Sequence, residues 1–251
     1  MNPVELARDW QLALVKALHI PTRTESHVII SDCGLEAWFF NGVVKILDKE
    51  ELDVCTIENE LRKLKSYSWK YETTSAPWYL AKVLTEYVLA PFEPQFPVFV
   101  RDLGSDDPKT TEYADFEVTI KKVRTEAEFK AWESYLAKRY ELWPALKEIY
   151  SVFFWEAVKR GHISCYSAVG EDGKVKATGA ISFYNGAAYI SNGTFKEEVY
   201  GAHLDQHLIK VAKKANACAL VEMCQPEKAP YMEGQGYTHV TNYQWFKTEC
   251  G

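Results

Sequence analysis

Apolar residues recur at helical or alternating spacing along most of the chain, and clusters of turn-forming residues separate these stretches. The most turn-prone cluster, Leu103–Thr111, is rich in Asp, Gly and Pro. It predicts a boundary between a first segment, residues 1–102, and a second, residues 112–251. In the first segment the pattern predicts mixed α/β structure, with helices at 3–17, 52–66 and 78–89 and strands at 28–31, 42–47, 67–71 and 97–101.

The second segment is predicted to be a larger α/β unit. Asp172-Gly173 is a hairpin signature between two apolar stretches. Apolar residues at Leu204, Leu208 and Val211 follow helical spacing. The predicted order is strand 116–123, helices 125–138 and 143–160, strands 164–169, 175–184 and 187–194, helix 198–215, strand 219–224, helix 228–233 and strand 238–246.

Composition narrows the class of protein. The chain has 251 residues, of which 47% are hydrophobic and 14% aromatic, enough to form one or two cores and unlike a disordered protein. A net charge of −6 argues against a nucleic-acid binder, which would carry a basic excess. Charged residues within the first 20 positions exclude a signal peptide, and no apolar run is long enough for a membrane span. We therefore expect a cytoplasmic protein with no membrane or nucleic-acid partner.

The cysteine and histidine positions predict no metal. The six cysteines form no C-x-x-C pair, which is typical of reduced, structural thiols. His203 and His207 are four residues apart, but a zincin helix needs Glu directly after the first His, and Leu204 occupies that position. We expect these two histidines to lie on a helix stripe that faces water.

The C-terminal part of the chain resembles one known topology. The stretch Gly186–Thr194 leads through a turn into a long helix, an apolar strand follows, and Tyr231–Tyr237 forms a Tyr-bearing turn. This order is similar to that of the GCN5-related N-acetyltransferase (GNAT) superfamily, over about residues 116–246. The resemblance implies an α/β (α+β) fold in which strands 187–194 and 219–224 are parallel neighbours. The first segment resembles the leading half of two-part bacterial GNAT proteins, a smaller, degenerate copy of the same fold, through residues 39–43, Trp69 and a proline-led helix.

The resemblance also implies acetyl-CoA, or another acyl-CoA, as cosubstrate. In the family, a loop of pattern R/Q-x-x-G-x-G/A at the start of the helix holds the pyrophosphate on backbone N–H groups. The matching residues here are Val199, Tyr200, Gly201, Ala202, His203 and Leu204. Val199 stands at the basic position and Leu204 at the last glycine position, where it could instead face the core. The pantetheine would then lie along Ser191, Asn192, Gly193 and Thr194.

Two residues are candidates for proton transfer. A tyrosine after the fifth strand of the family often protonates the departing thiolate, and Tyr231 is the candidate here. The family spacing to the Gly-aromatic pair is one residue shorter, so Met232 could occupy that place and Tyr231 could be a packing residue. Glu222 lies in an otherwise apolar strand, on the face of Leu220 and Cys224, and is the candidate general base. The alternative places it at an exposed strand end.

The resemblance implies transfer of an acyl group to a primary amine. The acceptor would contact the first two helices of the second segment, and an aromatic group there suits a small amine or a peptide N-terminus. This group comprises Trp132, Tyr135, Tyr140, Trp143 and Trp155. The alternative function is a catalytically inactive GNAT fold that serves as a ligand-binding or protein-interaction module. The sequence leaves a monomer and a homodimer equally open.

Overall fold

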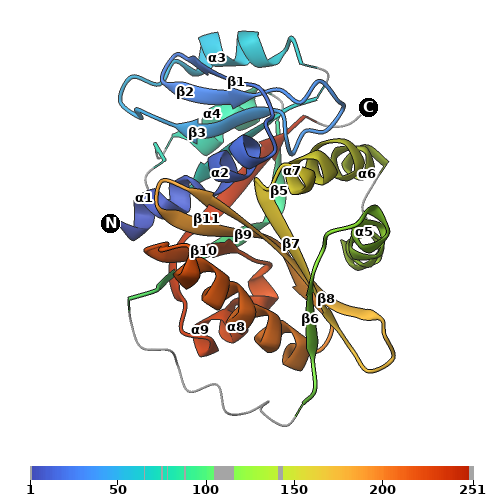
Figure 1. Cartoon of the computed structure of the whole chain (residues 1–251). Coiled ribbons are helices and arrows are strands. Elements are labelled where there is room, and N and C mark those ends of the chain that lie inside the picture. The colour runs from blue at the N-terminus through green and yellow to red at the C-terminus, as the bar shows by residue number, and fades with distance from the viewer. Residues whose placement is uncertain are drawn as a thin grey trace.

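The protein is an α/β protein built around one mixed sheet (Figure 1). The computed structural model describes residues 2–64, 66–74, 76–77, 79–87, 89–104, 116–140 and 144–248. The described strands form one eleven-stranded sheet in the order β1-β2-β3-β4-β11-β5-β10-β9-β8-β7-β6. Its strands are β1 (Thr22–Glu25), β2 (Val28–Ser31), β3 (Gly42–Ile46), β4 (Ser68–Glu72), β5 (Ala90–Asp102), β6 (Thr119–Lys122), β7 (Ile163–Val169), β8 (Val175–Tyr184), β9 (Ala187–Phe195), β10 (Ala219–Met223) and β11 (Thr238–Lys247).

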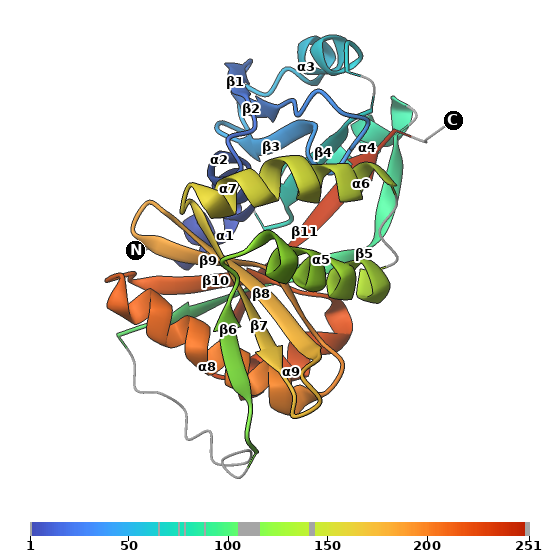
Figure 2. The same cartoon turned by 45° about the vertical axis from the view of Figure 1, so that its right-hand side comes forward.

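Helices cover both faces of this sheet (Figures 1 and 2). They are α1 (Pro3–Arg8), α2 (Trp10–Ala17), α3 (Val54–Leu61), α4 (Leu80–Glu86), α5 (Glu126–Tyr140), α6 (Pro144–Ile149), the π-helix η1 (Tyr150–Phe154), α7 (Trp155–Lys159), α8 (Glu198–Lys214), the 3-10 helix η2 (Pro226–Lys228) and α9 (Ala229–Gly234). None of the described helices is long and apolar enough to span a bilayer.

Two stretches of the chain repeat one local arrangement. In the N-terminal half, β3 pairs antiparallel with β2, α3 follows, and β4 returns parallel to β3. In the C-terminal half, β8, β9, α8 and β10 repeat this order, and β10 is parallel to β9. The predicted parallel pairing of strands 187–194 and 219–224 is therefore confirmed. The N-terminal half is the smaller copy.

The two halves exchange strands within the sheet. β5 precedes the predicted boundary, yet it pairs antiparallel with β10 of the C-terminal half. β11 lies between β4 and β5 and is antiparallel to both. Residues 105–111 of the boundary cluster lie outside the described residues. The division into residues 1–102 and 112–251 stays a prediction, and the sheet runs across it.

Alternation along the strands separates the core into one cluster on one face and two on the other. On the first face, α1, α2 and α5–α7 pack against residues such as Tyr189, Val221 and Trp245. On the opposite face, α8 and α9 cover the C-terminal half, where Ile190 and Leu220 lie. α3 and α4 cover the same face of the N-terminal half. Each strand thus contributes alternate residues to different cores.

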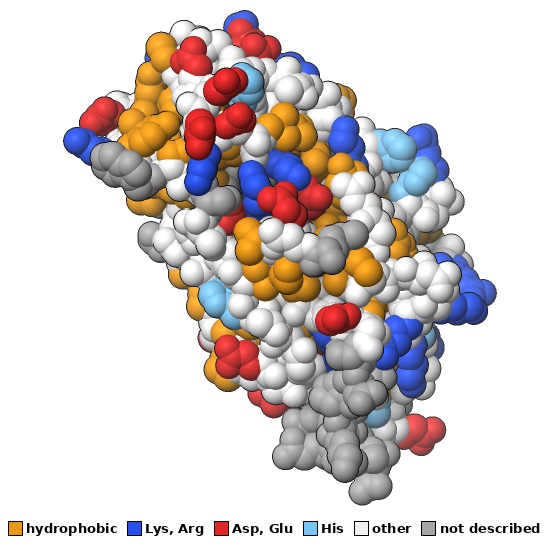
Figure 3. Space-filling view, turned by 90° about the vertical axis from the view of Figure 1, so that its left-hand side faces the viewer, with side chains coloured by type: hydrophobic (Ala, Val, Ile, Leu, Met, Phe, Trp, Pro, Cys, Tyr) orange, Lys and Arg blue, Asp and Glu red, His pale blue; other side chains and the backbone are white. Residues whose placement is uncertain are grey.

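Some predicted elements differ from the observed ones. The helix predicted at 3–17 is divided at Asp9, whose carboxylate pairs with Lys45 of β3. Nearby, Arg8 Nε lies 3.7 Å from Glu72 Oε1. Acidic and basic side chains lie next to one another on the side of the molecule shown in Figure 3. The helix predicted at 143–160 contains the π-helical turn η1, and strand β1 was not predicted. Neither the Asp9–Lys45 ion pair nor the single π-helical turn η1 produces a periodic hydrophobic pattern, so the sequence could not predict them.

Candidate active site

The site begins where β9 and β10 diverge. Their parallel pairing runs from Leu220↔Ala188 to Glu222↔Ile190. Between Ser191 and Thr194, the pairing of β9 with β8 shifts by one residue, which marks a β-bulge. Within this bulge Asn192 has a φ of +57°, the left-handed conformation that asparagine tolerates better than most residues. The β9–β10 pairing thus ends just before this bulge, which leaves a gap between the two strand ends.

On one face of the sheet this gap opens into a cavity of about 260 Å³, here called the aromatic cavity. Both diverging strands reach it, since Ser191, Asn192 and Gly193 line one side and Met223, Cys224 and Gln225 the other. Its other lining residues are nearly all aromatic and come mostly from the N-terminal half: Trp10, Leu14, Trp38, Phe39, Phe40, Phe92, Phe96, Tyr150, Phe154 and Trp245.

On the opposite face lies a much smaller hollow of about 10 Å³, here called the α8 hollow. Its lining residues come from β8, β9, α8, β10 and the segment around α9: Thr178, Ile190, Gly193, Thr194, Phe195, Gly201, Leu204, Asp205, Leu208, Glu222, Lys228, Tyr231 and Met232. A volume of this size holds at most one water molecule. Gly193 lines both spaces, so the aromatic cavity and the α8 hollow meet at the bulge of β9.

Glu222 occupies this meeting point. Its side chain is buried, and a Cβ atom added at Gly193 would lie 2.4 Å from Glu222 Oε1. Glu222 Oε2 has no hydrogen-bond partner among the described residues. As predicted from alternation, Glu222 lies on the face of Leu220 and Cys224. It is not at an exposed strand end, and that alternative is wrong.

Burial, together with the repulsion between Glu222 and Asp205, shifts the pKa values of the ionisable groups in the α8 hollow. Burial, helped by the nearby Asp205 charge and opposed by Lys228, raises the pKa of Glu222 to about 8. Burial also raises the pKa of Asp205 to about 6. The pKa of Lys228 is lowered, again mainly by burial. Perturbed groups gathered in one place are a signature of functional sites.

Tyr231 and Met232 lie side by side at the start of α9, and their surroundings differ. The Tyr231 hydroxyl donates a hydrogen bond of 2.9 Å to Asp205 Oδ2. Burial raises the pKa of the Tyr231 phenol well above 10, and the Asp205 charge raises it further. The Met232 side chain is buried in the core beneath α8. Tyr231 therefore lines the α8 hollow, with its proton directed at a carboxylate.

The start of α8 carries two acidic residues, and the Phe195 ring covers part of its first turn. Glu197 is the N-cap residue, makes no side-chain capping bond, and is followed by Glu198. Of the predicted phosphate-loop residues, Val199, Tyr200 and His203 are half-buried, whereas Gly201, Ala202 and Leu204 are buried. The Phe195 ring lies so close to Gly201 that an added Cβ would meet it at 2.4 Å. Lys228 Nζ in turn lies 4.3 Å from the centroid of the Phe195 ring.

The remaining sequence-predicted residues lie elsewhere. Trp132 is fully buried and donates to Tyr166 O, so it is a core residue. Tyr135 donates to Lys176 O, and Trp155 packs on Phe129. None of these three lines the aromatic cavity. The predicted aromatic group also included Trp143, which lies outside the described residues, as does the side chain of Tyr140.

Sequence reasoning missed the aromatic residues that do line the cavity. They come mainly from the run Trp38-Phe39-Phe40 and from Phe92 and Phe96, which share one side of β5. The run itself was a usable signal, because three consecutive aromatic residues outside a helix or strand are unusual and all three belong to one core cluster here. Its partner across the sheet, Trp245 of β11, could be found only from the strand order.

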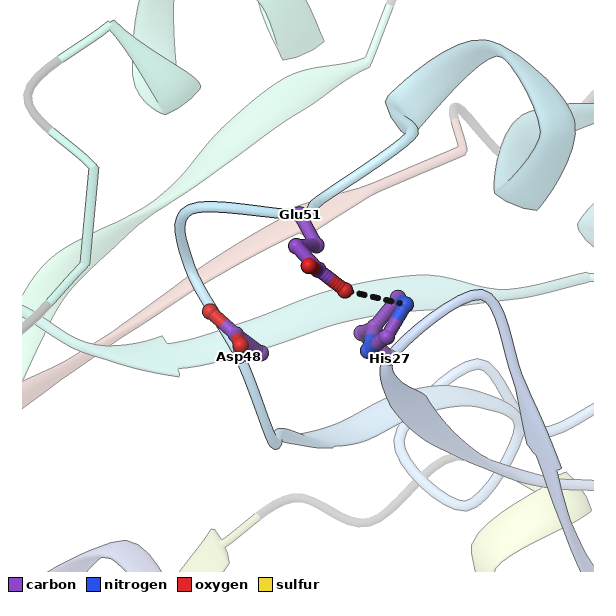
Figure 4. A group of neighbouring side chains, drawn as sticks. All are labelled: His27, Asp48 and Glu51. Atoms are coloured by element: carbon purple, nitrogen blue, oxygen red, sulfur yellow. Dashed lines mark ion pairs between the residues drawn. The ribbon is translucent and has the colours of Figure 1, made fainter.

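His203 and His207 belong to no group of three or more close metal ligands within the part of the chain that the structure describes. His203 and His207 are half-buried rather than facing water, and the His207 ring lies 4.8 Å from the ring of Tyr166. Among the described residues, one group has ligand atoms close enough to hold a metal ion: His27, Asp48 and Glu51 (Figure 4). All three are exposed, and His27 Nε2 is paired with Glu51 Oε2 at 3.1 Å. Exposed acidic groups of this kind are common without an ion.

No protein-family model and no curated protein matches the sequence. Solved structures match its fold. A GCN5-related N-acetyltransferase from Kribbella flavida covers 98% of this chain and 96% of its own, at 15% identity and a TM-score of 0.66. A functionally unknown conserved protein from Staphylococcus epidermidis ATCC 12228 covers 92% and 95%, at 12% identity and a TM-score of 0.64.

The tandem GNAT protein from the clavulanic acid biosynthesis pathway covers 78% of this chain and 68% of its own, at 14% identity and a TM-score of 0.51. At these identities the likeness concerns the fold. The repeated strand–helix–strand arrangement, with its diverging parallel strands, agrees with it. The chain has the fold of the GNAT superfamily, with two GNAT-like halves.

Proposed function

We propose that the protein is an N-acyltransferase that moves an acetyl or other acyl group from acyl-CoA to a primary amine. One observation carries this proposal: the diverging ends of β9 and β10 join two spaces, one on each face of the sheet, at Gly193. A thioester can reach such a junction from one face while an amine reaches it from the other. Proximity of this kind is a large part of catalysis in group transfer.

Acyl-CoA would enter from the side of α8. Thr194 Oγ1 and Glu222 Oε2 line the α8 hollow and have no partner among the described residues, so they suit a ligand that carries amide groups, such as pantetheine. The first N–H groups of the 17-residue helix α8 would hold the phosphates. Because the α8 hollow is so small, the Lys228 and Glu222 side chains must move to admit the ligand.

The reaction needs one proton to leave the amine and one to reach the sulfur. The amine nitrogen attacks the thioester carbonyl carbon, the C–S bond breaks, and the thiolate takes up a proton. The Glu222 carboxylate would take the proton that leaves the amine; with a pKa of about 8 it is mostly protonated at pH 7, so it would act as this base mainly above about pH 8. Tyr231 remains the proposed proton donor, although its bond to Asp205 Oδ2 must break first.

A second function has its own support. The α8 hollow is filled by Glu222, Lys228 and the Phe195 ring. The family spacing to the Gly-aromatic pair would place Met232, and not Tyr231, at the position of the tyrosine. These features favour a catalytically inactive GNAT fold that binds a ligand in the aromatic cavity alone. The two functions differ in whether acyl-CoA binds at all.

Calorimetry with acetyl-CoA separates them. The enzyme proposal predicts saturable binding, a rise in melting temperature, and thiol release once a suitable amine is added. No heat and no thermal shift at millimolar acetyl-CoA would instead support the inactive module.

A charge variant tests where the phosphates bind. Glu198→Gln removes a negative charge from the first turn of α8, so the affinity for acetyl-CoA should rise about two- to fivefold. Glu233→Gln, an exposed change on α9, is the matched control and should leave the affinity unchanged. Equal effects of the two variants would place the phosphates elsewhere.

A further inference from the structure

We propose that the aromatic cavity binds a compact ligand whose apolar body carries one uncharged hydrogen-bond acceptor, and that Trp245 recognises this acceptor. In terms of the proposed function, on which this identification rests, the ligand is the amine that receives the acyl group. The inference therefore names a substrate class: small aromatic or aliphatic primary amines with an ether, hydroxyl or carbonyl oxygen on the body.

The size and lining of the cavity set the body of the ligand. At about 260 Å³ it lies near the lower end of ligand pockets, which run from about 300 to 1,000 Å³, so it suits a single ring or a short chain. None of the described residues that line it carries a charge. A charge on the body of the ligand would lose its hydration here without gaining an ionic partner. The amino group itself would lie at the bulge, where Gly193 adjoins the Glu222 carboxyl group.

Two buried hydrogen-bond donors determine which polar group the ligand should carry. Trp245 Nε1 and Asn192 Nδ2 belong to lining residues, and neither has a hydrogen-bond partner among the described residues. Buried donors are normally paired, and leaving one unpaired destabilises the protein. A ligand oxygen that accepts from them would remove this cost. Asn192 lies at the bulge of β9, next to the proposed reaction centre, whereas Trp245 lies on β11, between the halves.

The surroundings of the cavity disfavour a polycation. Lys247 Nζ lies 5.3 Å from the ring centroids of both Trp38 and Phe92, so the faces of these two lining rings already have a cation. A second ammonium group on the ligand would meet this charge, and the described residues that line the cavity include no carboxylate to offset it. Polyamines are therefore excluded as good ligands.

In this proposal the N-terminal half helps to select the ligand, because its aromatic residues line the cavity. The Trp10 indole donates to Ile190 O at 2.9 Å and ties α2 to β9 just before the bulge. Phe39 and Phe96 pack on Trp245, at ring-centroid distances of 5.9 and 4.8 Å. The smaller GNAT-like half thus forms much of the wall that would select the acceptor.

Two amines of nearly equal shape test the proposal by calorimetry without acyl-CoA. 4-Methoxyphenethylamine has an ether oxygen where 4-ethylphenethylamine has a methylene group. The methoxy compound should bind about tenfold more tightly, the usual effect of one hydrogen bond to an otherwise unpaired donor. Trp245→Phe keeps an aromatic ring but removes the donor, so this variant should bind the two amines equally, at the level of the ethyl compound.

Two further variants serve as controls for this result. Trp155→Phe alters a half-buried tryptophan that does not line the cavity, so it should keep the tenfold preference. Phe96→Trp fills part of the cavity and should weaken both amines, and its melting temperature reports whether it is folded. Spermidine should bind more weakly than either amine.

The possible outcomes separate this inference from the proposed function. Equal binding of the two amines to the unaltered protein, tighter binding of spermidine, or no binding of either aromatic amine overturns the inference, even where another amine gives thiol release. Selective binding with no thiol release in the presence of acetyl-CoA supports the inference and counts against the acyltransferase.

Discussion

Tyr231 Oη donates a hydrogen bond of 2.9 Å to Asp205 Oδ2, and this bond links α9 to the buried face of α8. Asp205 is buried, and the charges of Lys228 and Arg101 also act on its carboxylate. Because the carboxylate accepts the phenol proton, loss of that proton would leave two negative groups in contact. The same bond therefore stabilises the fold and makes Tyr231 a weaker acid.

Tyr231→Phe tests both roles at once. Removing the hydroxyl leaves Asp205 without this donor, so the free energy of unfolding should fall by about 1–3 kcal/mol. If Tyr231 also protonates the thiolate, kcat should fall on the order of 10²-fold while acetyl-CoA affinity stays nearly constant. Denaturant titration and single-turnover kinetics measure the two effects. A stability loss with unchanged kcat would assign Tyr231 to packing alone.

Glu222→Gln should change how stability depends on pH. The unfolded Glu222 releases its proton near pH 4.5, whereas the folded protein holds it to about pH 8. Folding is therefore favoured by this group below about pH 4.5, and that contribution is lost as the pH rises to about 8. Glutamine does not titrate, so the variant should gain stability relative to the unaltered protein across this window.

Denaturant titrations at pH 4.5, 6 and 8 measure the Glu222 effect. Asp205 and Lys228 face Glu222 and also titrate, but they are present in both proteins. Glu227→Gln, an exposed change just beyond β10, is the control and should give a curve parallel to that of the unaltered protein. If Glu222→Gln also gives a parallel curve, Glu222 titrates normally in the folded state.

Gly201→Ala should destabilise the protein even though alanine favours helices. An added Cβ would meet the Phe195 ring at 2.4 to 2.7 Å, and that ring packs on Tyr231 at 4.8 Å. Displacing it should cost about 1–3 kcal/mol, more than the gain of about 1 kcal/mol in helix propensity. Thermal unfolding measures the net change.

Gly234→Ala is the matched control, because nothing lies within 4 Å of the added Cβ in α9. It should leave the melting temperature unchanged or raise it. Combining Phe195→Ala with Gly201→Ala should cost less than the sum of the single variants, because the clash disappears. Additive losses would show that the Phe195 ring is not the obstacle.

Glu58→Ala should destabilise the N-terminal half without affecting the aromatic cavity. Glu58 is fully buried on α3 and accepts hydrogen bonds from the Tyr67 hydroxyl, at 2.9 Å, and from the Trp69 indole. Losing both bonds should lower the free energy of unfolding by about 2–4 kcal/mol. Urea denaturation measures this loss, and Asn59→Ala, an exposed change on the same helix, should have little effect.

Glu58, Tyr67 and Trp69 lie on the face of the sheet covered by α3 and α4, away from the aromatic cavity. Amine binding by the folded Glu58→Ala protein should therefore be unchanged. A loss of amine binding would mean that the two faces of the N-terminal half are coupled.

Periodicity was enough to find most of the sheet. The strands predicted at 28–31, 175–184 and 187–194 agree with β2, β8 and β9 to within one residue, because each carries a run of apolar or alternating residues. β5 is much longer than the predicted strand 97–101. Its prolines argue against a strand in sequence, although proline is tolerated at irregular pairings such as those between β5 and β11.

The candidate site was predictable only in part. The sequence placed Glu222 on the correct face, since alternation along one strand is a local property. It did not place Asp205 beside Tyr231, or Trp245 beside Phe39, because these contacts depend on how α8 and β11 pack. Whether the phosphate loop can bind acyl-CoA depends on the Phe195 ring over Gly201, which no spacing along the chain reveals.

Because β5 and β11 pair with strands of the other half, the fold affects how the chain folds during synthesis and whether it can be split into two fragments. A ribosome releases β5 long before β10 and β11, the two strands that flank it in the sheet. Until both emerge, the edges of β5 carry unpaired backbone groups on the nascent chain, a state that invites chaperones and misassociation. A polypeptide split after Gly104 would likewise give two fragments that each lack a neighbouring strand and reach the native sheet only by finding one another.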